Sequence, residues 1–197
     1  MSPSRGPTWI ILVDGPPCGG KSRVAAALGQ RLNLPLLTKD AIKERLFETL
    51  GWGDVERAYE FNRAANALLF DITKLLLATG QPFVLESNLR PERDGEVYAE
   101  LQAQWGFEAI QIHCSAAPEL LIERFRRRWG AGLRHPGHAD DRTEATVAER
   151  IRAGAYGPLA LRGPLMRVDT SGPAYVDVER LAISVMRQAQ AIGEVTG

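Results

Sequence analysis

The chain has 197 residues, of which 45% are hydrophobic and 24% are charged, so its composition is that of an ordinary globular domain. The 24 basic residues balance the 24 acidic ones, and a formal net charge of zero argues against a nucleic-acid or membrane partner. Two distant cysteines, Cys18 and Cys114, provide neither a disulfide framework nor a Cys-x-x-Cys metal motif. The apolar run 9–13 is far too short to span a membrane, so we expect a cytoplasmic protein.

The chain alternates between apolar runs that predict strands and amphipathic stretches that predict helices. In chain order these are a strand at 9–13, a helix at 21–32, a strand at 34–37, helices at 40–50 and 55–79, a strand at 81–86, a helix at 91–104, a strand at 108–113, a helix that Pro118 opens, a loop at 130–141, a helix at 143–153, a strand at 165–169 and a helix at 176–191. In the helix that begins at Pro118, we expect Leu121, Phe125 and Trp129 to form the buried stripe. The alternation predicts an α/β fold with a mainly parallel sheet, as a single domain over residues 1–197.

A phosphate-binding motif lies between the first predicted strand and the first predicted helix. The residues Gly15-Pro16-Pro17-Cys18-Gly19-Gly20-Lys21-Ser22 match the pattern G-x-x-x-x-G-K-[ST] in full. Glycines let backbone N–H groups face phosphates, and the start of a helix offers its positive end to an anion. We expect ATP to contact this loop and the adjoining Arg23, with Lys21 at the β and γ phosphates and Ser22 in the shell of a Mg²⁺ ion.

Two weaker interpretations of this segment remain. A Gly-rich turn between a strand and a helix can bind nothing at all. Cys18 could be a catalytic thiol, but no histidine lies near it in sequence, so we expect it to fill the loop without reacting.

Asp40 is the first candidate for contact with a phosphate acceptor. It follows the strand at 34–37 and begins a helix, which places it at the carboxyl edge of the sheet, where open α/β sheets bind ligands. A carboxylate there can accept the proton of a hydroxyl that attacks the γ phosphate. An acid also stabilises the start of its own helix, and the residues alone leave the two roles equally open.

Glu86 ends the strand at 81–86 and is the best candidate for an acid that orients Mg²⁺ or its water, with Asp14 a weaker one. The alternative for Glu86 is a solvated acid at a strand end. Asn88 and Arg90 follow on the same edge, where they either contact the acceptor or belong to a plain turn. The chain contains only four lysines, so each is a candidate for a specific role: Lys21, Lys39, Lys43 and Lys74.

An arginine cluster lies on the helix that follows Pro118. Arg124, Arg127 and Arg128 are neighbours at i, i+3 and i+4, and their mutual repulsion favours an anionic partner. With the loop that follows, they predict a lid at about 124–143, in which Arg124 and Arg128 stabilise the transition state and Arg134 contacts ATP. The alternative is a solvated face paired with Glu119 and Glu123. A zinc site lacks a second pair of ligands elsewhere, which argues against one at His135, His138 and Asp140.

The chain resembles the small P-loop kinases of the nucleoside-monophosphate-kinase-like group, particularly AAA-type ATP-binding proteins allied to chloramphenicol phosphotransferase, gluconate kinase and zeta toxins. The resemblance spans almost the whole chain and rests on four segments: Gly15 to Ser22, Leu37 to Glu44, Val84 to Asn88 and Arg124 to His138. It implies a three-layer P-loop NTPase fold with a five-stranded parallel sheet in the order 2-3-1-4-5, ATP and Mg²⁺ as cofactors, and Asp40 as the base. It also implies that Arg124, Arg128 and Arg134 are lid arginines. Adenylate kinases usually follow the loop lysine with Gly-Thr, so Ser22-Arg23 argues against a nucleoside monophosphate acceptor.

The expected function is transfer of the γ phosphate of ATP to a hydroxyl of a small molecule, by a monomer or homodimer. The region at about 40–79 would wall the acceptor site and contribute Arg63, although a packing helix with a wet face explains the same residues. Two other functions stay open. One is an ATPase switch that acts on a partner; the other is a polynucleotide 5′-hydroxyl kinase, which the zero net charge weakens.

Overall fold

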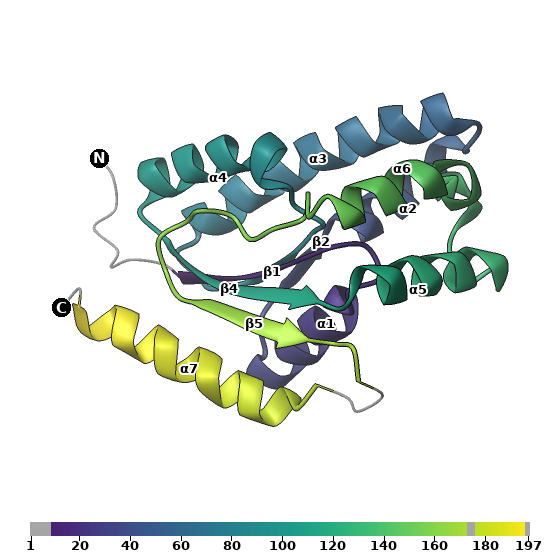
Figure 1. Ribbon diagram of the computed structural model, residues 1–197. Helices are drawn as coiled ribbons and strands as arrows, with labels where there is room; N and C mark the ends of the chain where they lie inside the picture. Colours follow the sequence, from purple (N-terminus) through teal and green to yellow (C-terminus); the bar gives the residue numbers. More distant parts are fainter. Residues whose placement is uncertain (1–8, 173–175, 196–197) are drawn as a thin grey trace.

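The computed structural model describes residues 9–172 and 176–195, and Figure 1 shows a central sheet with helices on both faces. The strands are β1 (Trp9–Asp14), β2 (Leu36–Thr38), β3 (Val84–Glu86), β4 (Glu108–Ser115) and β5 (Leu165–Asp169). All neighbouring strands are parallel, in the order β2-β3-β1-β4-β5. The predicted fold class and strand order are therefore confirmed.

The helices follow the predicted alternation, with small shifts at their ends. They are α1 (Lys21–Leu32), α2 (Lys39–Leu50), α3 (Val55–Ala78), α4 (Pro91–Trp105), α5 (Pro118–Gly130), the 3-10 turn η1 (Pro136–His138), α6 (Asp140–Arg152) and α7 (Val178–Val195). The segment expected to be a loop at 130–141 contains η1, and α6 begins at Asp140 rather than at 143. β2 begins at Leu36 because the N–H of Leu34 bonds to the Gly29 carbonyl at the end of α1, and Pro35 has no N–H. In the described residues, no helix is long and apolar enough to cross a membrane.

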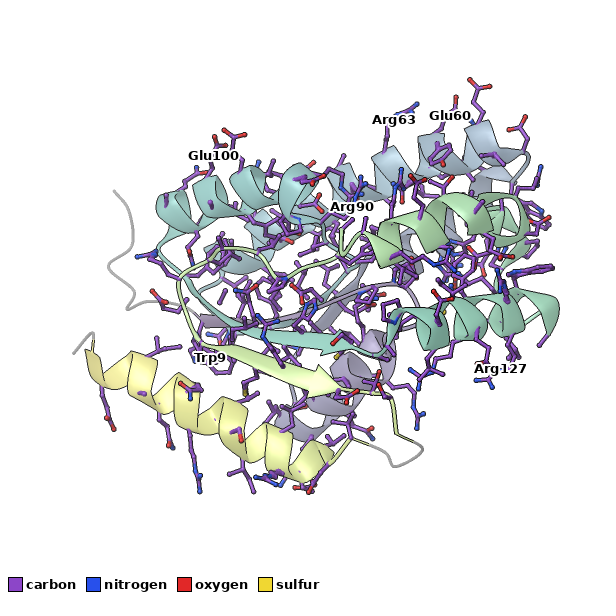
Figure 2. The ribbon with its side chains drawn as sticks, viewed as in Figure 1. Trp9, Glu60, Arg63, Arg90, Glu100 and Arg127 are labelled. Atoms are coloured by element: carbon purple, nitrogen blue, oxygen red, sulfur yellow. The ribbon has the colours of Figure 1, made fainter. Side chains whose placement is uncertain are left out.

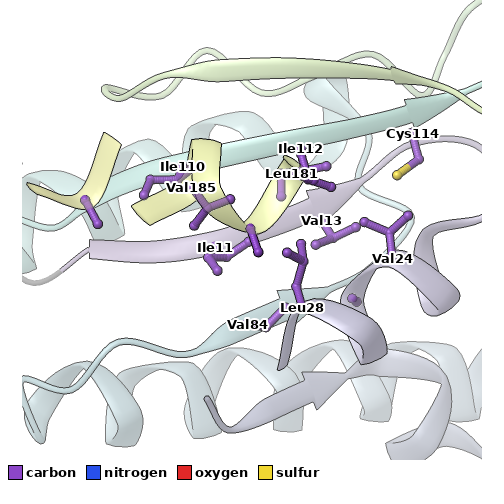
Figure 3. Close-up of a cluster of buried hydrophobic side chains, with 13 residues drawn as sticks. Ile11, Val13, Val24, Leu28, Val84, Ile110, Ile112, Cys114, Leu181 and Val185 are labelled. Atoms are coloured by element: carbon purple, nitrogen blue, oxygen red, sulfur yellow. The ribbon is translucent and has the colours of Figure 1, made fainter. Parts of the chain in front are cut away.

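Two apolar layers hold the helices on the sheet. On one face, residues of α1 and α7 such as Leu28 and Val185 pack against Ile11, Val84 and Ile110 of the strands (Figure 3). On the other face, a second cluster joins the sheet to α3 and α4. Because both faces are covered, the strands are nearly continuous apolar runs, as expected for a parallel sheet.

One part of the predicted core is wrong. Leu121 and Phe125 of α5 are buried, but Trp129 is 39% exposed. The cluster between α5 and α6 contains Leu121 and Ile122 and does not extend to the last turn of α5, where Trp129 lies. The buried stripe of α5 therefore stops before the helix ends.

The sheet brings the sequence motifs to one edge. The register pairs Glu86 at the end of β3 with Val13 on one side and Thr38 on the other. The chain leaves β1 into the phosphate-binding loop and leaves β2 directly into α2, which carries Asp40. Parallel strands thus present these groups together at their carboxyl ends.

Candidate active site

The loop between β1 and α1 has the backbone shape that its glycines permit. Gly15 has φ 130°, and a Cβ there would overlap the carbonyl oxygen of Cys114 on β4. Gly20 has φ 82° and caps α1 without a side chain, so no side-chain oxygen of the cap residue occupies the first N–H groups of the helix. This arrangement leaves the positive end of α1 for an anionic ligand.

Lys21 is turned into the loop that precedes it. Its side chain is buried, and Nζ donates a 2.7 Å hydrogen bond to the Pro16 carbonyl oxygen. Ser22 and Arg23 lie in the same first turn of α1 and are exposed. Burial raises the pKa of the Cys18 thiol, which keeps it protonated and weakly nucleophilic at neutral pH.

The loop opens into a cleft of about 740 Å³. Its walls include many of the predicted site residues, namely Pro17, Cys18, Gly20, Lys21, Ser22, Arg23, Asp40, Glu86, Asn88, Arg124, Arg128 and Arg134. Three buried polar atoms without a hydrogen-bond partner in the described chain belong to residues of this wall: Ser87 Oγ, Arg128 Nε and Arg134 Nε. Unpaired buried donors beside an open loop of N–H groups fit an anionic ligand such as a nucleotide.

Of the two candidate acids for Mg²⁺, Glu86 faces the cleft and Asp14 does not. Glu86 is 4% exposed and lines the cleft, and burial raises the pKa of its carboxyl group. Asp14 is fully buried, and its Oδ1 lies 2.7 Å from Nδ1 of His113. The hydroxyl of Ser22 and the carboxylate of Glu86 are oxygen ligands of the kind that Mg²⁺ prefers, so the donor set fits this ion.

Asp40 is held by an arginine from the predicted lid. Arg134 Nη1 donates a 2.8 Å hydrogen bond to Oδ2 of Asp40; the Arg134 side chain is 17% exposed and that of Asp40 is 35% exposed. Burial alone would raise the pKa of Asp40, but the Arg134 guanidinium outweighs it and holds that pKa well below its usual range. Arg134, which we expected at ATP, therefore contacts Asp40 in this structure, and Asp40 is ionised.

Further ion pairs and hydrogen bonds join charged residues within the predicted lid and connect it to α2. Arg128 donates to Asp140 at 3.0 Å, and Nε of Arg134 lies 3.6 Å from the same carboxylate. Arg134 Nη2 also donates to Nδ1 of His138 at 3.1 Å, which leaves Nε2 of that ring to donate to Glu44 at 3.0 Å. Burial and Arg134 lower the pKa of His138 to about 2, so this histidine is neutral.

The segment between α5 and α6 is docked on α2. The ring of Phe47 stacks on His135 with centroids 5.0 Å apart and meets His138 edge-on at 5.2 Å. The ring nitrogens of these histidines also have partners: Nδ1 of His135 accepts a 3.0 Å hydrogen bond from the Gly137 N–H, and both nitrogens of His138 are hydrogen-bonded. Within residues 9–172 and 176–195, no group of three His, Cys, Asp or Glu side chains could hold a metal ion.

Arg124, predicted as a lid arginine, contacts the end of β5. It donates to the Thr170 carbonyl oxygen at 2.6 Å and to the Thr170 hydroxyl at 3.3 Å. Oγ1 of Thr170 in turn lies 3.3 Å from the Gly19 carbonyl oxygen of the phosphate-binding loop. Arg124 thus lines the cleft while it braces the segment beside the loop.

A second, smaller pocket of about 140 Å³ adjoins the cleft. The two pockets share Pro17, Lys39, Asp40, Asn88, Arg128 and Arg134. Arg90 lines only the smaller pocket, and Figure 2 shows it between α4 and α6. Arg63 is exposed, lines neither the cleft nor the smaller pocket, and points outward from α3 in Figure 2. The structure therefore brings Asn88 and Arg90 to this pocket but leaves Arg63 outside.

The smaller pocket also contains residues that the sequence analysis did not assign to a site. Lys39 is 4% exposed and donates a 3.2 Å hydrogen bond to Oδ1 of Asn62 on α3. Arg93 and Arg150 come from α4 and α6. The scarcity of lysine was the available signal, since three of the four lysines line one pocket or the other: Lys21, Lys39 and Lys43.

Comparison with known proteins identifies the family. The sequence matches the AAA domain family AAA_33 over residues 10–154. A protein of Chloroflexus aurantiacus named as a candidate kinase is 39% identical, over 93% of this chain and 99% of that one, with a TM-score of 0.84. No curated protein sequence matches.

More distant solved structures share the fold. A sugar kinase of Janibacter sp. HTCC2649 is 16% identical, over 94% of this chain and 98% of that one, with a TM-score of 0.55. An APS kinase of Mycobacterium tuberculosis, solved with AMPPNP and APS, is 18% identical, over 94% and 99%, with a TM-score of 0.53. The chain therefore belongs to the AAA domain family AAA_33 and is built on the fold of the small P-loop kinases.

Proposed function

We propose that the protein is an ATP-dependent phosphotransferase that moves the γ phosphate of ATP to a hydroxyl of a small-molecule acceptor, with Mg²⁺ as its cofactor. The observation that carries this proposal is the position of Asp40. Its side chain lines both the cleft that holds the phosphate-binding loop and the smaller pocket beside it. A carboxylate at the junction of two sites is well placed to orient an acceptor toward a phosphate. Membership of AAA_33 and the similar Chloroflexus protein named as a candidate kinase support the same activity.

The residues of the loop would bind and orient the triphosphate. Lys21 would exchange its hydrogen bond to the Pro16 carbonyl for phosphate oxygens, and the N–H groups at the start of α1 would bind the β phosphate. Ser22 and Glu86 would hold Mg²⁺. When bound, this ion supplies charge neutralisation on the β and γ phosphates. Arg124 and Arg128, which line the same cleft, would stabilise negative charge on the transferring group.

Asp40 would align the acceptor and receive its proton. The acceptor oxygen forms a bond to the γ phosphorus while the bond from that phosphorus to the bridging oxygen of ADP breaks. The hydroxyl proton passes to Asp40 and then to solvent. A strong base is not required, because the transition state of phosphoryl transfer is loose and the proton leaves late. The low pKa of Asp40 is therefore compatible with this role and keeps it ready to accept a hydrogen bond.

The proposal is tested by ADP release with ATP and Mg²⁺ over a panel of hydroxyl compounds, including sugars, aminoglycosides, chloramphenicol, nucleosides, hydroxy acids and short oligonucleotides. Lys21→Ala serves as the blank. We expect release that depends on one class of small acceptor and yields a phosphorylated product. Low release that no acceptor changes would overturn the proposal and favour a switch driven by a partner; phosphorylation of oligonucleotides alone would favour a polynucleotide kinase.

A further inference from the structure

The smaller pocket has a surplus of positive charge. Seven cationic side chains line it, namely Lys39, Lys43, Arg90, Arg93, Arg128, Arg134 and Arg150, against the carboxylates of Asp40 and Asp140. The protein as a whole has no net charge, so this concentration of cations is local. Buried charges normally have partners, and a pocket that gathers one sign of charge attracts a ligand of the other.

Three of the seven cations are already neutralised. Arg134 pairs with Asp40, and Arg128 pairs with Asp140. Arg93 forms two 2.7 Å hydrogen bonds with the carboxylate of its neighbour Asp94. Each of these three carboxylates, Asp40, Asp140 and Asp94, is therefore already paired with an arginine.

Four cations remain without a carboxylate partner in the described part of the chain: Lys39, Lys43, Arg90 and Arg150. Lys39 is buried against a neutral amide, and Lys43 lies 5.3 Å from the centroid of the Phe47 ring. His138 also lines this pocket but is neutral, so it neither adds to the surplus nor offsets it.

Arg90 and Arg150 both line the pocket and come from different elements. Arg90 precedes α4, and Arg150 lies on α6. Burial lowers the pKa of Arg90, and the nearby charges of Arg93 and Arg150 lower it further. Side chains that repel one another in the free protein are stabilised when an anion binds between them.

We infer that the phosphate acceptor is itself an anion: a hydroxyl compound whose carboxylate or phosphate group binds Arg90 and Arg150 in the smaller pocket, beside Lys39. The hydroxyl of the same molecule then lies toward Asp40, which both pockets share. This inference rests on the proposed function and adds the chemical class of its substrate. The volume of about 140 Å³ is below the range typical of drug-sized ligands, which favours a small acceptor.

The first experiment measures binding and does not depend on turnover. Inorganic phosphate is titrated into the full chain by calorimetry, with the nucleotide site saturated by Mg²⁺ and a non-hydrolysable ATP analogue. We expect binding that weakens about tenfold or more in Arg90→Gln and in Arg150→Gln, as the loss of a charge-assisted hydrogen bond predicts. Arg187→Gln on the exposed side of α7 is the matched control and leaves phosphate binding unchanged.

A conservative variant separates charge from structure. Arg90→Lys keeps the positive charge and is expected to retain most of the phosphate affinity that Arg90→Gln loses. Equal phosphate affinity in the wild type, Arg90→Gln and Arg150→Gln would overturn the inference, as would the absence of phosphate binding.

The second experiment distinguishes a failure of this inference from a failure of the proposed function. Acceptors are compared in pairs that differ only in charge, such as a hydroxy acid and its amide, or a sugar phosphate and the free sugar. We expect kcat/KM for ADP release to be at least tenfold higher with the charged member, and the preferred pair shows which anionic group the pocket takes. Equal rates with both members would overturn the anionic acceptor while leaving the kinase intact. Phosphate binding that needs Arg90 and Arg150, with no acceptor-dependent release, would support the anion site and overturn the transfer reaction.

Discussion

Lys39 should destabilise the fold while it serves the site, and its replacement tests this directly. Lys39 is 4% exposed, and burial lowers the pKa of its ammonium group from 10.5 to about 8. Each factor of ten in proton affinity is worth about 1.4 kcal/mol, so the buried charge costs about 3 kcal/mol below pH 8. Lys39→Met also removes the hydrogen bond to Asn62, worth about 1 kcal/mol. We therefore expect Lys39→Met to be about 2 kcal/mol more stable at pH 7.

The sign of the pH dependence follows from the proton count. Between pH 8 and pH 10.5 the unfolded chain binds more protons at Lys39 than the folded chain does, so the stability of the wild type rises with pH in this window. Lys39→Met lacks this gain. The stabilisation by the substitution should therefore shrink by about 2 to 3 kcal/mol between pH 7 and pH 10.

The assay is urea unfolding followed by circular dichroism at pH 7, 8, 9 and 10, with thermal midpoints expected about 4 to 8 °C higher for Lys39→Met at pH 7. The matched control is Lys74→Met on α3, a lysine that lies over the Phe70 ring and lines neither pocket. If Lys39→Met unfolds more easily than the wild type at pH 7, or if its advantage changes with pH no more than that of Lys74→Met, the reasoning is refuted.

Three further substitutions test the cleft. Asp40→Asn should preserve ATP binding in calorimetry but lower kcat by about 100-fold or more, since the acceptor loses its carboxylate partner. A turnover near that of the wild type would exclude Asp40 as the base. Gly15→Ala should destabilise the chain by about 2 kcal/mol or more in urea and weaken nucleotide binding, because its Cβ would overlap the Cys114 carbonyl. An unfolding midpoint equal to that of the wild type would show that a Cβ at position 15 fits without this overlap. Glu86→Gln should raise the Mg²⁺ concentration needed for half-maximal ADP release, and an unchanged requirement would remove Glu86 from the metal site.

The layout of the fold was accessible from the sequence because it depends on local signals. Buried apolar runs, helical periodicity and the glycine-rich motif at 15–22 each act over a few residues. They predicted the element order, and the resemblance to P-loop kinases supplied the strand order that the structure confirms. The prediction that Trp129 is buried was wrong because the helical periodicity of the sequence continues to the end of α5, whereas the neighbouring helix does not cover the last turn.

The electrostatic arrangement of the site was not accessible in the same way. The pairing of Arg134 with Asp40 joins residues that lie 94 positions apart, and no short motif encodes it. The surplus charge in the smaller pocket depends on side chains from α2, α4 and α6 and on which of them already have partners. Arg63 was predicted to contact the acceptor, but its neighbours Tyr59 and Asn62 line the smaller pocket while Arg63 does not and points outward from α3 (Figure 2).

The contact between Thr170 and the phosphate-binding loop bears on where the folding unit ends. The family match stops at residue 154, but Thr170 lies against Gly19, and Arg124 holds it in place. Leu181 and Val185 of α7 also belong to the apolar layer that covers β1. A chain truncated at the end of the family match would therefore lose the edge strand β5, one of the two helices that cover one face of the sheet, and the residue that braces the phosphate-binding loop. The cooperative folding unit is therefore longer than the segment that the family model matches.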